Sequence, residues 1–142
     1  MKPYPHIYSV NASGSATGIV PVVTQGVPVI DTAPPPEFDG PGDVWSPETL
    51  LVGAVANCFI LTFRGVTRAA KFDWERVECQ VEGLLERSAG FTQFSKFTTR
   101  ATLHLSAQAD RAKAHKLLER AEKLCLIANS LRGERHLEVV IP

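Results

Sequence analysis

The 142-residue chain is long enough to bury one hydrophobic core, and we expect a single domain over residues 1–142. Its 15 Lys and Arg residues balance its 15 Asp and Glu residues, so the formal net charge is zero. A neutral chain gives no electrostatic reason to expect a nucleic acid or a membrane as partner. Near-zero charge does allow subunits to associate.

The N-terminal ten residues lack the apolar run of a signal peptide, and the most apolar stretch, residues 50–63, is too short to span a bilayer. Three widely spaced cysteines, Cys58, Cys79 and Cys125, argue against a disulfide scaffold. We therefore expect a cytoplasmic protein with free thiols.

The first third of the sequence predicts short strands at residues 5–12, 18–24 and 27–30, with Gln25 and Gly26 as a hairpin turn. Pro21 and Pro28 lack amide donors, which predicts edge strands or bulges. Residues 32–45 have no apolar period, and a loop this long in a small domain is usually functional or covers a site.

A helix is predicted to begin at Ser46-Pro47-Glu48 and to run to about Ala70. Ser46 can cap it, Pro47 suits the first helical position, and the carboxylate of Glu48 suits the positive end of the helix dipole. The middle of the helix is apolar on nearly all sides, over a length of roughly 36 Å. Because so small a monomer cannot easily enclose it, we infer that a second chain covers part of it.

The second half of the chain predicts a hairpin, a helix and a final strand. Apolar and polar residues alternate over 76–86 and 98–105, around a turn at residues 88–90. A helix from about Asp110 to Leu126 has an apolar stripe that includes Leu124 and Cys125, and residues 136–141 form the last strand. These elements predict an α+β fold in which helices pack on one face of antiparallel sheets.

Few residues in these elements suggest chemistry by themselves. Cys79 lies on the apolar face of its strand and is expected to pack as a small hydrophobe. Cys58 and Cys125 also suit a core, and no spacing links them. Glu48 precedes Cys58 by ten residues, or roughly 15 Å along a helix, so the two could act together only across a pocket. The apolar candidates to line such a pocket are Phe38, Trp45 and Phe59.

No metal or cofactor is expected. The sequence has no CxxC, HxH or HExxH pattern, and its four histidines are scattered. His104 is predicted on the wet face of its strand and His115 on the exposed side of its helix. Neither is placed beside a nucleophile as a general base.

Two motifs resemble the OsmC/Ohr family of osmotically inducible and organic hydroperoxide resistance proteins. The run FDGPGDVWSPETLL at residues 38–51, followed by VGAVANCF, is similar to its Gly-rich loop, helix start and first cysteine. The run CLIANSL at residues 125–131 is similar to its second cysteine motif. The resemblance covers essentially the whole chain and is better to the general OsmC-like branch than to the Ohr branch.

The resemblance implies an OsmC-like fold with the long central helix buried in an intertwined homodimer. It also implies a peroxidase that reduces organic hydroperoxides or hydrogen peroxide. Cys58 would then be the peroxidatic thiolate, Cys125 the resolving thiol that forms a disulfide with it, and Glu48 the residue that orients an activating arginine. The implied reductant is a dithiol, which in this family is often a lipoyl-bearing protein.

The sequence departs from the family pattern at two positions. The family's activating arginine usually comes from the N-terminal hairpin loop, but residues 11–18 read NASGSATG and the first arginine is Arg64. The activating arginine is then either absent or replaced from elsewhere, with Arg64 and Arg68 as the candidates. Leu126 follows the second cysteine, where the family usually has proline.

These departures keep two alternative functions open. One is a non-catalytic dimer that binds a small apolar ligand in a stress response. The other, an acyl- or alkyl-transferring cysteine enzyme, would need a base beside Cys58.

Overall fold

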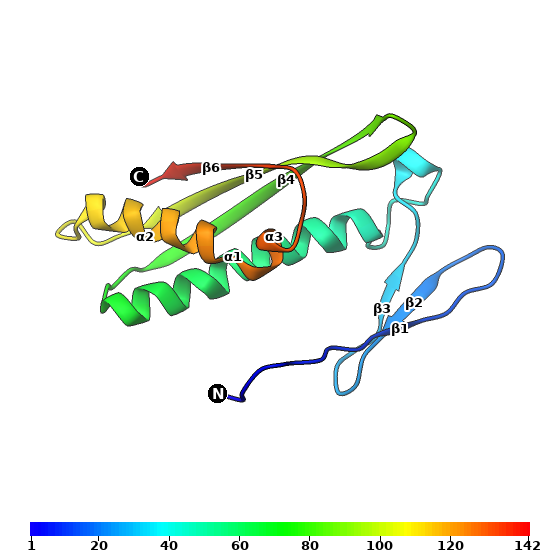
Figure 1. The fold of residues 1–142 in the computed structure, drawn as a ribbon, viewed down its shortest axis with the longest axis horizontal. Coiled ribbons are helices and arrows are strands. Elements are labelled where there is room, and N and C mark those ends of the chain that lie inside the picture. The colour runs from blue at the N-terminus through cyan, green and yellow to red at the C-terminus, as the bar shows by residue number, and fades with distance from the viewer. The chain divides into compact units, whose positions relative to one another are not determined.

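The computed structural model describes all residues from Met1 to Pro142, in two compact units, Met1–Leu50 and Leu51–Pro142 (Figure 1). Each unit contains one three-stranded sheet. In chain order the elements are β1 (Asn11–Ala12), β2 (Val20–Val23), β3 (Ile30–Thr32), the 3-10 turn η1 (Pro36–Phe38), α1 (Pro47–Ala70), β4 (Arg76–Ser88), β5 (Phe91–His104), α2 (Arg111–Leu124), α3 (Leu126–Asn129) and β6 (Glu134–Val140).

The first unit is built on the antiparallel sheet β1-β2-β3. The predicted turn between β2 and β3 is confirmed, with Gly26 at a φ of 83°. The first predicted strand is much shorter than expected. Only Asn11 and Ala12 pair with β2, and the preceding residues are exposed and form no ladder.

The expectation that Pro21 marks an edge strand is wrong, because β2 is the central strand of this sheet. The physical reason is the shortness of β1, which pairs only with Val22 and Val23. Pro21 faces Asp31 of β3 on one side and has no partner in β1 on the other. Its missing amide therefore breaks no hydrogen bond on the β1 side.

Helix α1 begins and ends as the sequence predicts, at Pro47 and Ala70. Ser46 and Thr49 cap its start reciprocally. The Thr49 amide donates to Ser46 Oγ at 3.2 Å, and the Ser46 amide donates to Thr49 Oγ1 at 3.0 Å. This is a capping box with threonine in place of the usual Glu or Gln. Lys71 ends the helix with a positive φ of 50°.

The second unit contains the predicted hairpin of β4 and β5, paired from Arg76↔His104 to Ser88↔Phe91 with one register shift between Leu84 and Leu85. Ala89 and Gly90 form its turn, and both have positive φ, as a two-residue hairpin turn requires. The predicted alternation is confirmed along β4, where Val77, Cys79 and Val81 are half-buried between exposed neighbours. The α+β class is likewise confirmed.

The last strand corrects one expectation about the sheets. Strand β6 pairs with β5 in parallel, so the sheet β4-β5-β6 is mixed rather than antiparallel. The reason is the connection: α2 and α3 return the chain across the sheet before β6 begins, and such a crossover aligns two strands in the same direction.

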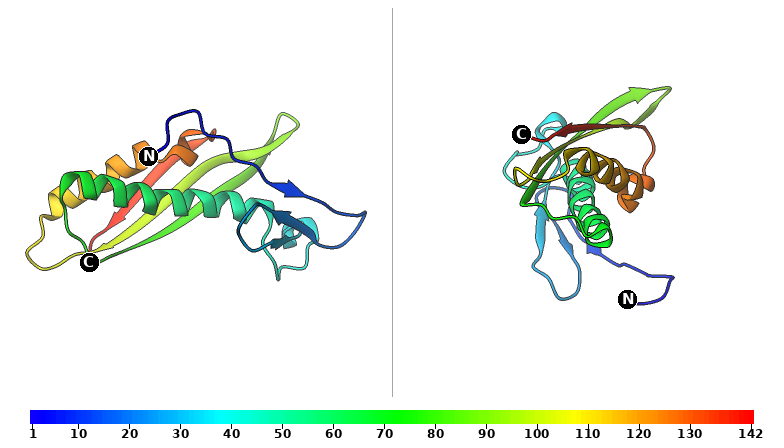
Figure 2. Two further views of the ribbon diagram at one scale, coloured as in Figure 1. Left: turned by 90° about the horizontal axis from the view of Figure 1, so that it is seen from below. Right: turned by 90° about the vertical axis from the view of Figure 1, so that its left-hand side faces the viewer.

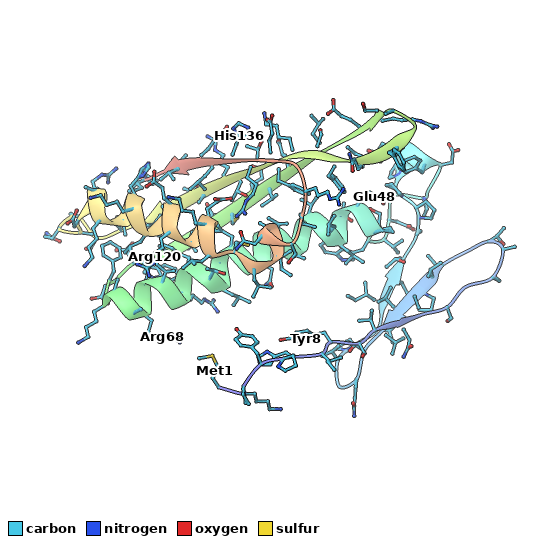
Figure 3. All side chains as sticks on the ribbon, in the orientation of Figure 1. Met1, Tyr8, Glu48, Arg68, Arg120 and His136 are labelled. Atoms are coloured by element: carbon cyan, nitrogen blue, oxygen red, sulfur yellow. The ribbon has the colours of Figure 1, made fainter.

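Helices α1 and α2 cover the same face of this sheet (Figures 1 and 2). The main core forms where they meet it, from Phe59, Phe63, Val66, Ala101, Leu103, Ala114, Leu117, Leu118 and Ala121. His136 extends from β6 on the opposite, exposed face (Figure 3). The core therefore lies in a single layer between helices and sheet.

Helix α1 is only partly covered within one chain. Its buried residues are Val55, Cys58, Phe59, Phe63, Val66 and Thr67, whereas Leu61 is 52% exposed. By length and composition alone this helix could cross a membrane, but the core helix of a soluble protein passes the same test. Since Phe59 and Phe63 are fully buried in the main core, α1 is such a core helix.

Candidate active site

A break between α2 and α3 places Cys125. The sequence predicted one helix from about Asp110 to Leu126, and Asp110 does cap it by accepting the Lys113 amide at 2.9 Å. The prediction that Cys125 lies on the helical stripe is wrong. Cys125 has extended backbone angles, φ −62° and ψ 102°, and α3 starts after it. The break turns Cys125 inward, to 1% exposure, and leaves Leu124 52% exposed.

The break brings the two predicted cysteines together. Cys58 of α1 and Cys125 belong to one buried cluster with Val55, Phe97 and Ala128. Both are free thiols, and Cys58 is 9% exposed. The structure therefore places side by side two residues that no sequence spacing connects.

The Cys58 sulfur lies in surroundings that favour its thiolate. Burial raises the pKa of this thiol, but hydrogen bonding from the Ile127 backbone, the Cys125 side chain, Thr62 and the Leu126 backbone lowers it by more. The pKa of Cys58 is therefore below its ordinary value. The Thr62 hydroxyl lies 3.8 Å from the sulfur, one helical turn along α1.

Cys125 is shifted in the opposite direction. Burial raises the pKa of this thiol, and its hydrogen bond to Cys58 and the charge of that sulfur raise it further. The Ala128 backbone and the positive charge of Arg135 lower it by less. Cys58 is therefore the more acidic thiol of the pair, and the more acidic thiol forms the nucleophilic thiolate more readily.

Cys79 is a contrasting case. Burial, with a smaller effect of Cys125, raises the pKa of the Cys79 thiol to about 12. It stays protonated at neutral pH and packs against the main core, as a structural cysteine does.

One arginine lies near the cysteine pair, and it is neither Arg64 nor Arg68. Those two are exposed on α1, and their side chains form no hydrogen bond or ion pair within the chain. Arg135 of β6 reaches the helix break instead. Its Nε donates to Glu122 Oε1 at 2.6 Å and its Nη1 to Asn129 Oδ1 at 2.6 Å.

Glu48 occupies the first turn of α1, as predicted. It forms no ion pair, and one of its carboxylate oxygens, Oε1, is buried without a hydrogen-bond partner. Phe59 is fully buried in the main core, whereas Phe38 and Trp45 are 53% and 55% exposed. The role of Glu48 stays a prediction.

Three of the four histidines lie near carboxylates, whereas His6 lies near the Lys2 carbonyl. His104 Nε2 is 3.8 Å from Glu78 Oε2, and His115 Nδ1 is 3.5 Å from Glu119 Oε1. No histidine is among the groups that shift the pKa of Cys58. The site therefore offers a thiol whose pKa is lowered by hydrogen bonds and not by a neighbouring histidine.

Comparison with known proteins shows the family of the chain. The sequence model of the family described as OsmC-like protein matches residues 40–140. The chain belongs to the OsmC-like protein family. The match includes α1 and both cysteines of the site.

Relatives of this OsmC-like chain include a curated sequence and solved structures. It is 29% identical over 123 residues to the uncharacterized protein YmaD of Bacillus subtilis, which is 84% of this chain and 82% of the relative. An OsmC-like protein of unknown function from Vibrio cholerae superposes with a TM-score of 0.86 at 19% identity, over 96% of this chain and all of that one. An organic hydroperoxide resistance protein OsmC from Legionella pneumophila superposes with a TM-score of 0.73 at 25% identity, covering 96% and 98% of the two chains.

The sequence prediction missed Thr62, Asn129 and Arg135 of this OsmC-like site. A signal for Arg135 exists in the sequence. Arg135 lies on the same face of β6 as the half-buried Leu137 and Val139, whereas His136 lies on the opposite, exposed face. A charged residue on an otherwise apolar face indicates a buried partner. Thr62 could have been found as the polar residue one helical turn after Cys58.

Proposed function

We propose that this OsmC-like protein is a thiol-dependent peroxidase that reduces organic hydroperoxides or hydrogen peroxide. The observation that supports it most is the pair Cys58 and Cys125, buried together with opposite shifts of pKa. The names of similar structures, such as the organic hydroperoxide resistance protein of Legionella pneumophila, point to the same class of redox function.

In the first step the Cys58 thiolate attacks the distal oxygen of the peroxide. A sulfur–oxygen bond forms, the oxygen–oxygen bond breaks, and the alkoxide leaves as an alcohol after taking a proton. Cys58 becomes a sulfenic acid. The hydrogen-bond donors around the sulfur hold it as the thiolate that this attack requires.

In the second step the Cys125 sulfur attacks the sulfenic sulfur of Cys58. Water leaves and a Cys58–Cys125 disulfide forms, which protects Cys58 from further oxidation. An external dithiol, for example on a lipoyl-bearing protein, then reduces the disulfide and restores both thiols. The role of Glu48 in this scheme is to orient a cationic group at the substrate.

We place the enzyme in the cytoplasm, where a reducing environment keeps the thiols free. We also propose that it works as a homodimer. The partly exposed apolar residues of α1, with Leu61 half exposed, are the surface that a second copy would bury. No nucleic acid or membrane partner is part of the proposal.

A second candidate function is a non-catalytic dimer that binds a small apolar ligand. It is favoured by an open groove of about 550 Å³ between α1 and α2, lined by Thr62, Val66, Ala69, Leu117 and Leu124 among others. Binding of an apolar fluorescent probe to a protein that leaves peroxides intact would support this function.

The deciding experiment is thiol mapping by mass spectrometry, before and after one equivalent of cumene hydroperoxide, with thiol blocking on quench. A Cys58–Cys125 disulfide that forms within seconds, with Cys79 still free, is the expected result. A Cys58 that stays a free thiol for many minutes would rule out the peroxidase and favour the binding protein.

A further inference from the structure

The helix break at Cys125 removes helical hydrogen bonds between α2 and α3, and two of them concern the groups around Cys58. In an uninterrupted α-helix the amide of residue 126 would bond to the carbonyl of Glu122, and that of residue 127 to the carbonyl of Lys123. The extended conformation of Cys125 separates these partners. Buried carbonyls and amides seldom stay unpaired, so other groups must take their places.

Two side chains donate hydrogen bonds to the carbonyls of Glu122 and Lys123. The Arg135 guanidinium donates through Nη2 to the Glu122 carbonyl, which also accepts the Cys125 amide at 3.4 Å. Asn129 donates through Nδ2 to the Lys123 carbonyl at 3.1 Å. The side chains of Arg135 and Asn129 thus cap the C-terminus of α2, in place of the amides that a continuous helix would have supplied.

Arg135 and Asn129 form one unit. The guanidinium binds the Asn129 side-chain oxygen at 2.6 Å, which turns the Asn129 amide nitrogen toward the Lys123 carbonyl. It also binds the Glu122 carboxylate at 2.6 Å, and both of these side chains are mostly buried, at 26% and 20% exposure. Because Arg135 is anchored in β6, the break is tied to the sheet.

Two of the amides released by the break, those of Leu126 and Ile127, lie next to the cysteine cluster. Ile127 packs against the cluster that holds Cys58 and Cys125, and hydrogen bonding from its backbone and from that of Leu126 lowers the pKa of Cys58. No charged side chain is among the groups that act on Cys58. The other members of the cluster, from α1, β4 and β5, are apolar.

We propose that Arg135 and Asn129 are positioning residues, which hold the α2–α3 break open by occupying the carbonyls of Glu122 and Lys123 and so direct the amides of Leu126 and Ile127 at the Cys58 sulfur. Backbone amides then supply the stabilisation of the thiolate in a chain whose N-terminal loop contains no arginine. The consequence for peroxide reduction rests on the proposed function, but the effect on the thiol does not.

The test is the pH profile of Cys58 alkylation by iodoacetamide, followed at that residue by mass spectrometry in the full-length protein. Arg135→Gln removes the cap on Glu122 and is expected to move the profile to higher pH, with an about tenfold lower rate at pH 7 for a shift of about one unit. Arg132→Gln removes the same charge from an exposed neighbour and is expected to keep the wild-type profile. Circular dichroism confirms that both variants are folded.

A backbone variant tests the same inference without touching Arg135. Leu126→Pro removes one amide at a site that accepts proline, since Leu126 is the first residue of α3 and Cys125 before it is extended. It is compared with Leu126→Ala, which keeps the amide and loses the same exposed side chain. The profile of the proline variant is expected to lie at higher pH than that of the alanine variant.

The outcomes separate this inference from the proposed function. Overlapping profiles for Arg135→Gln and wild type, or for the two Leu126 variants, would overturn the positioning role even in an active peroxidase. Shifted profiles in a protein that does not consume peroxide would support the positioning role and rule out the proposed peroxidase.

Discussion

Cys58 and Cys125 lie in one buried cluster, and the pKa values of their two thiols are shifted in opposite directions. The hydrogen bond between them lowers the pKa of Cys58 and raises that of Cys125. The asymmetry comes from the backbone, because the break before α3 presents two amides to Cys58, from Leu126 and Ile127, and only that of Ala128 to Cys125. In the proposed peroxidase, this difference at a helix end would make Cys58 the attacking thiol and Cys125 the resolving one.

Replacing Cys125 with alanine should make Cys58 a weaker acid. The variant removes the thiol that donates to the Cys58 sulfur, so the pKa of Cys58 should rise and its alkylation by iodoacetamide should begin at higher pH. Residue-resolved alkylation rates from pH 5 to 10 measure the shift. Cys79→Ala is the matched control, and an equal shift in both variants would contradict a specific hydrogen bond.

Replacing Cys125 with serine should stop the proposed reaction after its first step. Cys58 would still be oxidised, but no thiol would be available to condense with the sulfenic acid. Dimedone labelling should then trap the sulfenic acid at Cys58, and excess peroxide should carry it on to sulfinic acid. Cys58→Ser should abolish peroxide turnover altogether. Unchanged turnover in this variant would show that Cys58 takes no part in the mechanism.

The sequence was sufficient to predict local structure with strong patterns. The start of α1 was readable because Ser46 and Pro47 have positional preferences of their own, and the β4–β5 hairpin because alternation and the turn at Ala89 and Gly90 are local. The α+β class follows from the order of such elements. These features depend on residues a few positions apart.

The features that the sequence did not predict depend on contacts between residues that are distant along the chain. The stripe that includes Cys125 is a good helical pattern, yet the helix breaks there. Arg135, ten residues later on β6, and Asn129 donate to the carbonyls that the break leaves without helical partners. Likewise, Pro21 lies in a central strand because its neighbour β1 is short, which no pattern in β2 reveals. The pairing of Cys58 with Cys125 came only from a family resemblance, not from spacing.

The buried thiol of Cys79 should make the protein sensitive to alkali. In the folded state the pKa of Cys79 is about 12, raised from an ordinary value of 9.0 by burial. The folded protein holds this proton more tightly than the unfolded chain does. The resulting stabilisation is complete below pH 9 and is lost as the pH rises from 9 toward 12.

Urea denaturation at intervals from pH 8 to 11 measures this effect. In the wild type the free energy of unfolding should fall with pH more steeply than in Cys79→Ala, by up to about 1.4 kcal/mol per pH unit above pH 9. The other titrating groups contribute equally to the two slopes, and the cavity left by the substitution changes the free energy of unfolding by the same amount at every pH. The difference between the slopes therefore reports Cys79 alone. Parallel curves for the two proteins would show that Cys79 does not differ between the folded and unfolded states.

Gly133 should be intolerant of any side chain. It joins α3 to β6 with a φ of 107°, and an added Cβ would lie 2.9 Å from the Ser95 backbone, closer than such atoms approach. Gly133→Ala therefore combines backbone strain with a clash against β5. We expect a loss of about 2–4 kcal/mol in the free energy of unfolding.

Gly90→Ala is the matched control for this last variant. Gly90 also has positive φ, at 82°, but an added Cβ there meets no atom within 4 Å, so only the backbone cost of about 1 kcal/mol applies. Thermal and urea denaturation of both variants give the comparison. Because Gly133 is two residues before Arg135, its substitution should also shift the pH profile of Cys58 alkylation upward, whereas that of Gly90 should not. Equal losses of stability with an unshifted profile would mean that the approach of β6 to β5 does not set the position of Arg135.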